Sequence, residues 1–195
     1  LVGGGPVSAD RLDNGTLDLP GCSARWNCEV SSVVHVQAGT DVKLTLDSGD
    51  ARVSGQVGSV KVANDSGSVL VDGAQGAVTV ALDSGDVTLR DISAPVTASV
   101  DSGSINADGL SGDKASLVTS SGDVNAQFTV DPQSITAKSD SGSIAIAIPG
   151  KNPYAVKVSI GSGASKIDIP TDPTASRRLS LTADSGDIRV SRNPS

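Results

Sequence analysis

The sequence predicts an all-β fold: a single-stranded β-solenoid of about eight to ten rungs, with two short strands in each rung. The first observation is that Asp-Ser-Gly, or a close variant, returns along the whole chain, first 18 residues apart (Gly49 to Gly67) and finally 23 apart (Gly163 to Gly186). The second is that aliphatic residues alternate with polar ones on both sides of each copy. The third is composition, because 195 residues include only one Trp, one Tyr and one Phe. A narrow coil filled with Val, Ile, Leu and Ala fits that supply.

Each copy of the tripeptide predicts a tight turn. Asp accepts hydrogen bonds from backbone N–H groups two residues on, Ser does so more weakly, and Gly permits a positive φ. These properties are sufficient to explain the motif as a repeated structural corner, so no chemical site is needed. The predicted turn residues are Asp47, Gly49, Asp65, Gly67, Asp83, Gly85, Asp101, Gly103, Gly122, Asp140, Gly142, Asp184 and Gly186, with Gly163 in the shifted seventh copy.

A short strand follows each corner, with apolar residues two and four positions after the glycine, as at Val69 and Val71. In the seventh copy we align Ile167 and Ile169 with these two positions. A second alternating strand precedes each corner, as at Val60 and Val62. Two short strands cannot bury an apolar face alone, so successive units are expected to stack. The alternative is a β-sandwich of regular hairpins, but it does not require the same residue in one column for eight turns.

The connections between repeats lengthen along the chain, from "SGQVGS" to "PTDPTASRR". One corner of the coil is therefore fixed, and the opposite corner accepts insertions. We expect a local function to lie at these variable turns or at the N-terminal end.

Residues 1–45 are predicted to form an N-terminal cap that is continuous with the solenoid of residues 46–195. The chain has two cysteines, Cys22 and Cys28, which we predict to form a small disulfide loop, as expected of an exported protein. Trp26, between them, would cover the end of the core. At the other end, Arg189, Arg192 and Pro194 are predicted to discourage end-to-end strand pairing.

Two columns of acidic residues run past the corner. The Asp of each tripeptide forms the first column, and carboxylates about 5 Å apart in water repel by roughly 0.8 kcal/mol per pair. In the second column, Asp alternates with Ser for six rungs, which we interpret as keeping like charges apart. A ladder of calcium sites would instead place acidic residues on successive rungs. We therefore predict a protein without cofactors or metals and keep calcium binding only as a minor alternative. The second column reads Asp50, Ser68, Asp86, Ser104, Asp123, Ser143, Ala164, Asp187.

Composition also bounds the partners. The net charge of −7 argues against nucleic acid or an anionic membrane surface. No apolar run in this segment is long enough to cross a membrane. The chain begins with Leu, and we expect a signal peptide or membrane anchor in the full-length protein. His35 is the single histidine, so a Ser/His/Asp or Cys/His arrangement has little to build on, and we predict that the protein is not an enzyme.

The repeated "DSGDV", "DSGSI" and "SSGDV", each followed by alternating aliphatics over residues 41–190, resemble the bacterial adhesin-like domain family of unknown function. The resemblance implies a β-solenoid, usually exported and often fused to a membrane helix, and supplies no catalytic residues. We therefore expect a non-enzymatic extracellular recognition or structural module of a bacterial surface protein, which binds protein or a cell-wall polymer. The alternatives are a sensory or regulatory ectodomain of a membrane-associated envelope protein and, in third place, a glycan-active enzyme.

Overall fold

The computed structural model describes residues 33–193, and every helix or strand assigned in that range is a β-strand. The chain divides into two units, Leu1–Val36 and Gln37–Ser195, and the described strands belong to the second. Cys22, Cys28 and Trp26 lie outside the described residues. No helix among the residues described is long and apolar enough to cross a membrane.

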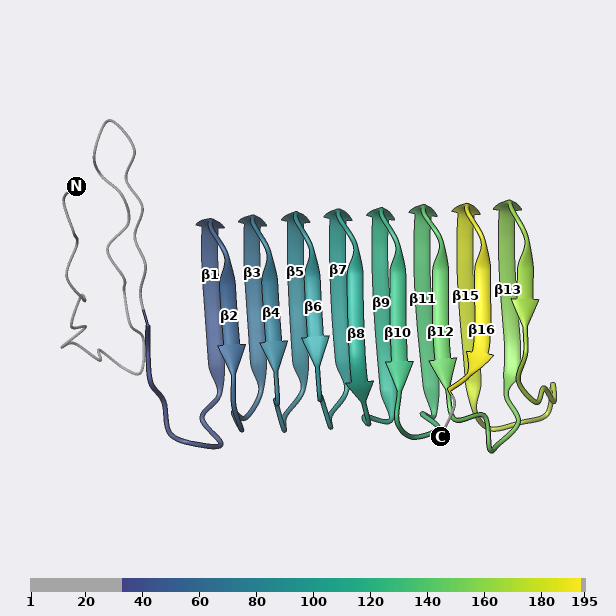
Figure 1. Ribbon diagram of the computed structural model, residues 1–195, viewed down its shortest axis with the longest axis horizontal. Coiled ribbons are helices and arrows are strands. Elements are labelled where there is room, and N and C mark those ends of the chain that lie inside the picture. The colour runs from purple at the N-terminus through teal and green to yellow at the C-terminus, as the bar shows by residue number, and fades with distance from the viewer. Residues whose placement is uncertain (1–32, 194–195) are drawn as a thin grey trace. The chain divides into compact units, whose positions relative to one another are not determined.

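The described strands form two parallel sheets of eight strands, and each rung gives one strand to each sheet (Figure 1). This confirms the predicted β-solenoid, and the parallel pairing rules out the hairpin sandwich. Sheet 1 contains, in spatial order, β1 (Val42–Ser48), β3 (Val60–Ser66), β5 (Val78–Ser84), β7 (Val96–Ser102), β9 (Lys114–Ser121), β11 (Ser134–Ser141), β15 (Arg178–Ser185) and β13 (Ala155–Ser162). Sheet 2 contains β2 (Ala51–Ser54), β4 (Val69–Asp72), β6 (Val87–Arg90), β8 (Ile105–Leu110), β10 (Val124–Phe128), β12 (Ile144–Ile148), β16 (Ile188–Arg192) and β14 (Ser165–Ile167). Because β1 begins at Val42, residues 42–45 of the predicted cap belong to the first rung.

The tripeptides lie at one corner of the coil, between the two strands of each rung, and we call this turn the glycine corner. Its glycines have φ between 107° at Gly49 and 147° at Gly142, a conformation that residues with a Cβ rarely adopt. Stacking adds a second requirement that the sequence did not reveal. A Cβ on Gly67 would lie closer than 3.0 Å to the carbonyl oxygen of Gly49, and the later corner glycines meet their neighbours in the same way. From the second rung on, glycine is required at the corner both for its φ and for its size.

The aspartates of the tripeptides do not make the turn bonds that we predicted. The Gly49 N–H donates to the Ser66 carbonyl at 2.9 Å, and the Ala51 N–H donates to the Ser68 carbonyl at 2.9 Å. The corner's backbone donors are thus bonded to the next rung, where stacking offers them an acceptor. Five of these aspartates are exposed, and the sixth, Asp140, is paired with Lys138 at 2.7 Å. The exposed five are Asp47, Asp65, Asp83, Asp101 and Asp184.

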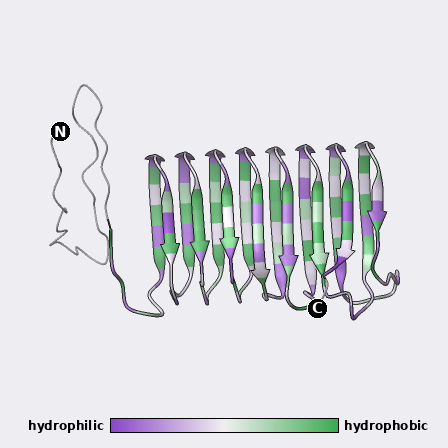
Figure 2. Cartoon of the chain, viewed as in Figure 1, coloured by the Kyte–Doolittle hydropathy of each residue, from purple (hydrophilic) through white to green (hydrophobic). Residues whose placement is uncertain are grey.

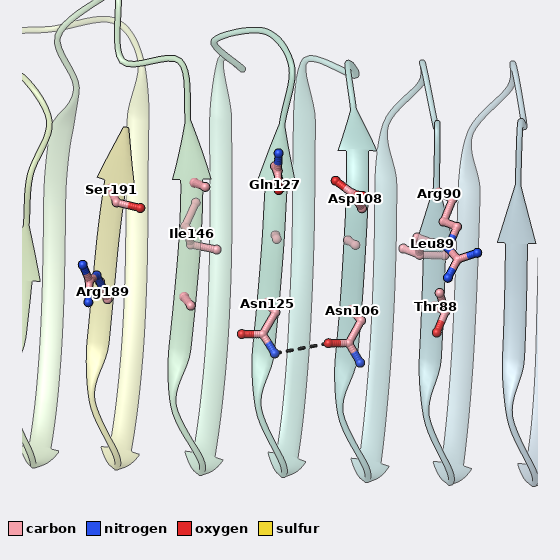
Figure 3. Close-up of a pocket in the computed structure, with 14 residues that line it drawn as sticks. Thr88, Leu89, Arg90, Asn106, Asp108, Asn125, Gln127, Ile146, Arg189 and Ser191 are labelled. Atoms are coloured by element: carbon pink, nitrogen blue, oxygen red, sulfur yellow. Dashed lines mark hydrogen bonds between the residues drawn. The ribbon is translucent and has the colours of Figure 1, made fainter. Parts of the chain in front are cut away.

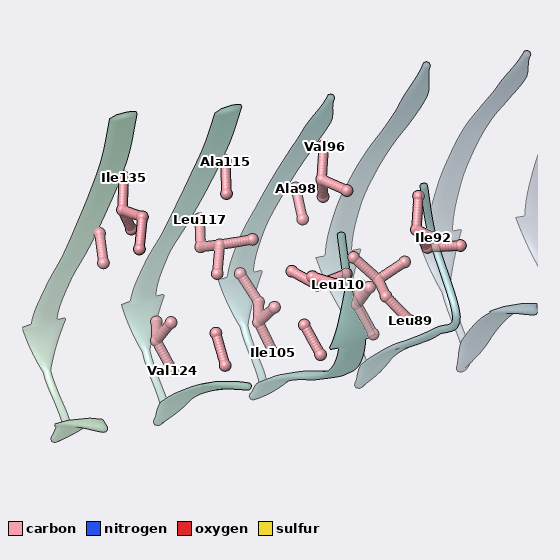
Figure 4. Close-up of a cluster of buried hydrophobic side chains, with 14 of the residues drawn as sticks. Leu89, Ile92, Val96, Ala98, Ile105, Leu110, Ala115, Leu117, Val124 and Ile135 are labelled. Atoms are coloured by element: carbon pink, nitrogen blue, oxygen red, sulfur yellow. The ribbon is translucent and has the colours of Figure 1, made fainter. Parts of the chain in front are cut away.

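The core lies between the two sheets and is aliphatic, as the alternation predicted (Figure 4). Hydrophobic and hydrophilic residues alternate along the strands (Figure 2). Side chains such as Val69, Leu89 and Leu117 are 0 % exposed, and burying each contributes about 1.5–3 kcal/mol. The single Phe and the single Tyr, Phe128 and Tyr154, are also fully buried. Both lie next to the connections between rungs, Phe128 at the end of β10 and Tyr154 just before β13.

The last two rungs do not stack in chain order. Strand β15 lies between β11 and β13, and β16 lies between β12 and β14. The expectation that successive units stack is therefore wrong at this end, although it holds for the first six rungs. The physical reason is the length of the connections at residues 149–154 and 168–177, which let the chain pass to the outer position and return.

Two smaller predictions are wrong because of this strand order. Strand β16 is internal, so Arg189 and Arg192 do not protect the edge of a terminal strand. In the seventh copy, Ile167 pairs with Val190 and Ser165 pairs with Ile188, so our alignment of Ile167 and Ile169 was shifted by two residues. Because β14 is outermost, the Ser165 position is open to solvent on one side and does not require an aliphatic residue.

Candidate functional site

The outer face of sheet 2 contains a shallow hollow of about 380 Å³ that spans β6 to β16 (Figure 3). The residues three and five positions after each corner glycine point to this face, because their neighbours point into the core. Most of the side chains presented to the hollow are polar. The long ones are Arg90, Asn106, Asp108, Asn125, Gln127 and Arg189.

The hollow exists because one strand lacks long outward side chains. Strand β12 reads Ile-Ala-Ile-Ala-Ile, with the isoleucines buried and Ala145 and Ala147 facing outward. The strands on either side carry Asn125 and Arg189 opposite Ala145, so the surface is lowest along β12.

Two asparagines form a ladder across the middle of the hollow. The Asn125 side-chain N–H donates to Asn106 Oδ1 at 3.2 Å (Figure 3). Both residues are exposed, and each amide has further donor and acceptor positions for a ligand. Gln127 Nε2 donates to Asn193 Oδ1 at 3.2 Å, and this bond holds the C-terminal segment beside the hollow.

The two arginines of the hollow are exposed. Within residues 33–193, neither Arg90 nor Arg189 takes part in a salt bridge or a side-chain hydrogen bond. Asp108 is the one carboxylate among the lining residues, and it faces Arg90 in the register of β6 and β8. The hollow therefore offers two unpaired guanidinium groups, three amides and one acid.

The second acidic column at the glycine corner is bonded from rung to rung. Asp50 Oδ1 accepts the Ser68 N–H at 2.7 Å, and Asp86 Oδ1 accepts the Ser104 N–H at 2.8 Å. Asp123 accepts the Ser143 N–H in the same way. The alternation that we interpreted as charge separation thus also supplies an acceptor for every second backbone donor.

The variable connections, where we expected a local function, are held by internal bonds. Asp131 accepts the N–H groups of Gly150, Lys151 and Asn152 at 2.8, 3.0 and 2.9 Å. The buried Tyr154 hydroxyl donates to the Pro132 carbonyl at 2.9 Å. These contacts explain how the connections keep their shape, and they leave the face of sheet 2 as the stronger candidate.

The groups with shifted pKa values lie outside the hollow. Hydrogen bonds from Ser59 lower the pKa of Asp41, and hydrogen bonds from Thr174 lower the pKa of Asp172. Burial raises the pKa of Tyr154. In the described part of the chain, no three His, Cys, Asp or Glu side chains gather as metal ligands do.

The signal that could have located the hollow was present in the sequence. Outward positions carry Asn106 and Asn125 in consecutive rungs, followed by Ala145 and Ala147. The inward columns predict the fold, whereas these outward columns carry the signal for the hollow.

No match to the chain was found among the curated proteins or among the solved structures. A family model does match: the Toastrack domain of unknown function, DUF4097, covers residues 32–191, which include every strand from β1 to β15 and most of β16. The match confirms the resemblance to a domain family of unknown function, and the chain belongs to the Toastrack DUF4097 family.

Proposed function

We propose that this domain is a non-enzymatic recognition module of an exported bacterial surface protein, and that the outer face of sheet 2 binds a cell-surface polymer. The observation that carries the proposal is the hollow over β12, lined by amides and unpaired arginines on a rigid sheet. Ligand-binding sites are concave and present a few fixed polar groups, and both features occur here.

The lining residues favour binding over catalysis. Asp108 is the one acid among them, and no His or Cys lines the hollow. Hydrolysis of a glycosidic bond generally uses two carboxylates that flank the bond, and proton transfer by a single exposed acid is a poor substitute.

The test is binding of the chain to purified bacterial cell walls, measured by co-sedimentation. Ala145→Tyr fills the hollow, while Ala81→Tyr makes the same change on the outer face of sheet 1. We expect Ala145→Tyr to abolish binding and Ala81→Tyr to preserve it. Equal binding by both variants, or no binding by the unchanged chain, would contradict the proposal; release of soluble fragments from the walls would contradict the non-enzymatic part.

A further inference from the structure

We propose that the hollow of sheet 2 binds an acidic glycopolymer that lies along the solenoid axis, across the strands. Its carboxylate or phosphate groups would contact Arg90 and Arg189, and its hydroxyl groups would contact Asn106 and Asn125. This inference rests on the proposed function and names the class of polymer.

The spacing of the polar groups suits an extended chain. Arg90 lies on β6 and Arg189 on β16, which are separated by β8, β10 and β12. At about 4.8 Å per strand, the two arginine positions are roughly 19 Å apart along the axis. The two asparagines lie between them on adjacent strands and share a row with Ala145 and Arg189, whereas Arg90 lies in the next outward row, about 7 Å farther along its strand. A polymer along the axis therefore meets Arg189, the low alanine floor and the two asparagines in turn, and it reaches Arg90 by crossing the sheet obliquely.

The charges on this face differ from those of the protein as a whole. The chain carries a net charge of −7, yet its acidic columns lie at the glycine corner. Arg90 lies in register between Asp72 of β4 and Asp108 of β8, and among the described residues its guanidinium group forms no salt bridge with either carboxylate. Asp187 is close to Arg189 in the sequence, but its carboxylate accepts a backbone N–H at 2.8 Å. Both guanidinium groups are thus free to bind an anion, and the two carboxylates beside Arg90 oppose that binding.

The same face is a poor fit for a peptide. An extended peptide binds best by adding a strand to a free sheet edge, and the strands of the hollow, β6 to β16, have neighbours on both sides. Protein interfaces also depend on buried aromatic or aliphatic anchors, and no large apolar side chain points outward here. Amides in fixed positions suit hydroxyl groups, and guanidinium groups suit carboxylates and phosphates.

Asp108 and the two arginines should change the affinity for an acidic polymer in opposite directions. Asp108 faces Arg90 and would repel an acid group on the ligand. Removing its charge should strengthen the binding of an acidic polymer, whereas removing an arginine should weaken it. A purely structural role for these residues does not predict opposite effects.

The experiment measures binding of the full chain to four immobilised polymers at several salt concentrations. Polygalacturonate supplies carboxylates, a polyglycerol-phosphate teichoic acid supplies phosphates, dextran is neutral, and poly-L-glutamate is an acidic polypeptide. The variants are Arg90→Gln, Arg189→Gln and Asp108→Asn, with Lys61→Gln on the outer face of sheet 1 as the charge-matched control. We expect one or both acidic glycopolymers to bind, with affinity that falls with salt. Each arginine variant should weaken that binding about tenfold, Asp108→Asn should strengthen it, and Lys61→Gln should leave it nearly unchanged.

Four results would overturn the inference. Equal binding of dextran would remove the acid requirement and leave the proposed function intact. Tighter binding of poly-L-glutamate would assign the hollow to a polypeptide. Equal losses of affinity in Lys61→Gln and Arg90→Gln would mean that the net charge of the protein, and not the hollow, determines binding. If the chain binds cell walls in the Ala145→Tyr test but none of the four polymers, this inference fails alone; if it binds neither, the proposed function fails as well.

Discussion

Asp187 Oδ1 accepts the backbone N–H of Ala164 at 2.8 Å, and the Asp187 N–H donates to Ser143 Oγ at 3.3 Å. The last rung of the chain is thus bonded on both sides, to the sixth rung and to the seventh. In chain order, the second acidic column loses its alternation at Ala164. In spatial order it alternates without a break until the outermost rung: Asp50, Ser68, Asp86, Ser104, Asp123, Ser143, Asp187, Ala164.

The order of the last rungs is testable by amide hydrogen exchange. Strands β15 and β16 have a neighbour on each side, while β13 and β14 have one. Outer rungs open with less loss of packing, so we expect the amides of residues 165–167 to exchange faster than those of residues 188–190. Stacking in chain order would give the reverse ranking.

The rung-to-rung carboxylate bonds predict a difference between two nearby aspartates. The Asp86 carboxylate accepts the Ser104 N–H. Asp83 is exposed at the same corner, and among the described residues its carboxylate accepts no hydrogen bond. Asp86→Ala should lower the free energy of unfolding by about 1 kcal/mol. Asp83→Ala should be neutral or slightly stabilising, because it removes a charge from the first acidic column. Chemical denaturation of both variants checks this, and equal losses would contradict the assigned role of Asp86.

Because the corner glycines stack, a Gly→Ala substitution should cost more stability at an internal rung than at the first rung. Gly49 has no atom within 4 Å of an added Cβ, whereas a Cβ on Gly103 meets the carbonyl of Gly85. Both substitutions by Ala strain a positive φ, at a cost of about 1–3 kcal/mol. Gly103→Ala should cost about 1–3 kcal/mol more from overpacking. Thermal unfolding of the two variants measures the difference, and matching stabilities would mean that only φ requires glycine here.

Tyr154 predicts alkaline sensitivity. Its pKa is raised by burial, so the unfolded chain loses the phenol proton at a lower pH than the folded protein. The stability that this provides is fully present below pH ~10, the usual pKa of the phenol, and is lost as pH rises above that value. Tyr154 is the one tyrosine of the chain, so tyrosinate absorbance reports on it alone. We expect no titration near pH 10 until the protein unfolds, and a weaker alkaline loss in Tyr154→Phe.

Lysines on the outermost rung are expected to limit association between copies of the chain. Strands β13 and β14 have unpaired edges, and Val156, Val158 and Ile167 are only partly buried there. Lys157 and Lys166 are exposed on these edge strands, and lysine at an edge opposes pairing with another chain. Replacing both by Thr should increase concentration-dependent association in sedimentation velocity. Lys138→Thr, on the internal strand β11, is the control and should have no such effect.

The sequence by itself determined the repeating unit. Each strand–corner–strand segment is local, and alternation together with a glycine at the turn is enough to define it, as at Val60, Val62 and Gly67. From these columns the all-β class, the two strands per rung and the aliphatic core could be predicted.

The tertiary structure decided what depends on contacts between rungs. Periodicity does not say which rung lies beside which, and the long connections at residues 149–154 and 168–177 permit a change of order. Only that order pairs Asp187 with Ala164 and places Arg189 next to Ala145, so it also sets the second acidic column and the hollow. The physical reason is that a rung's own residues fix its shape, whereas its surface is completed by neighbours that are distant in sequence.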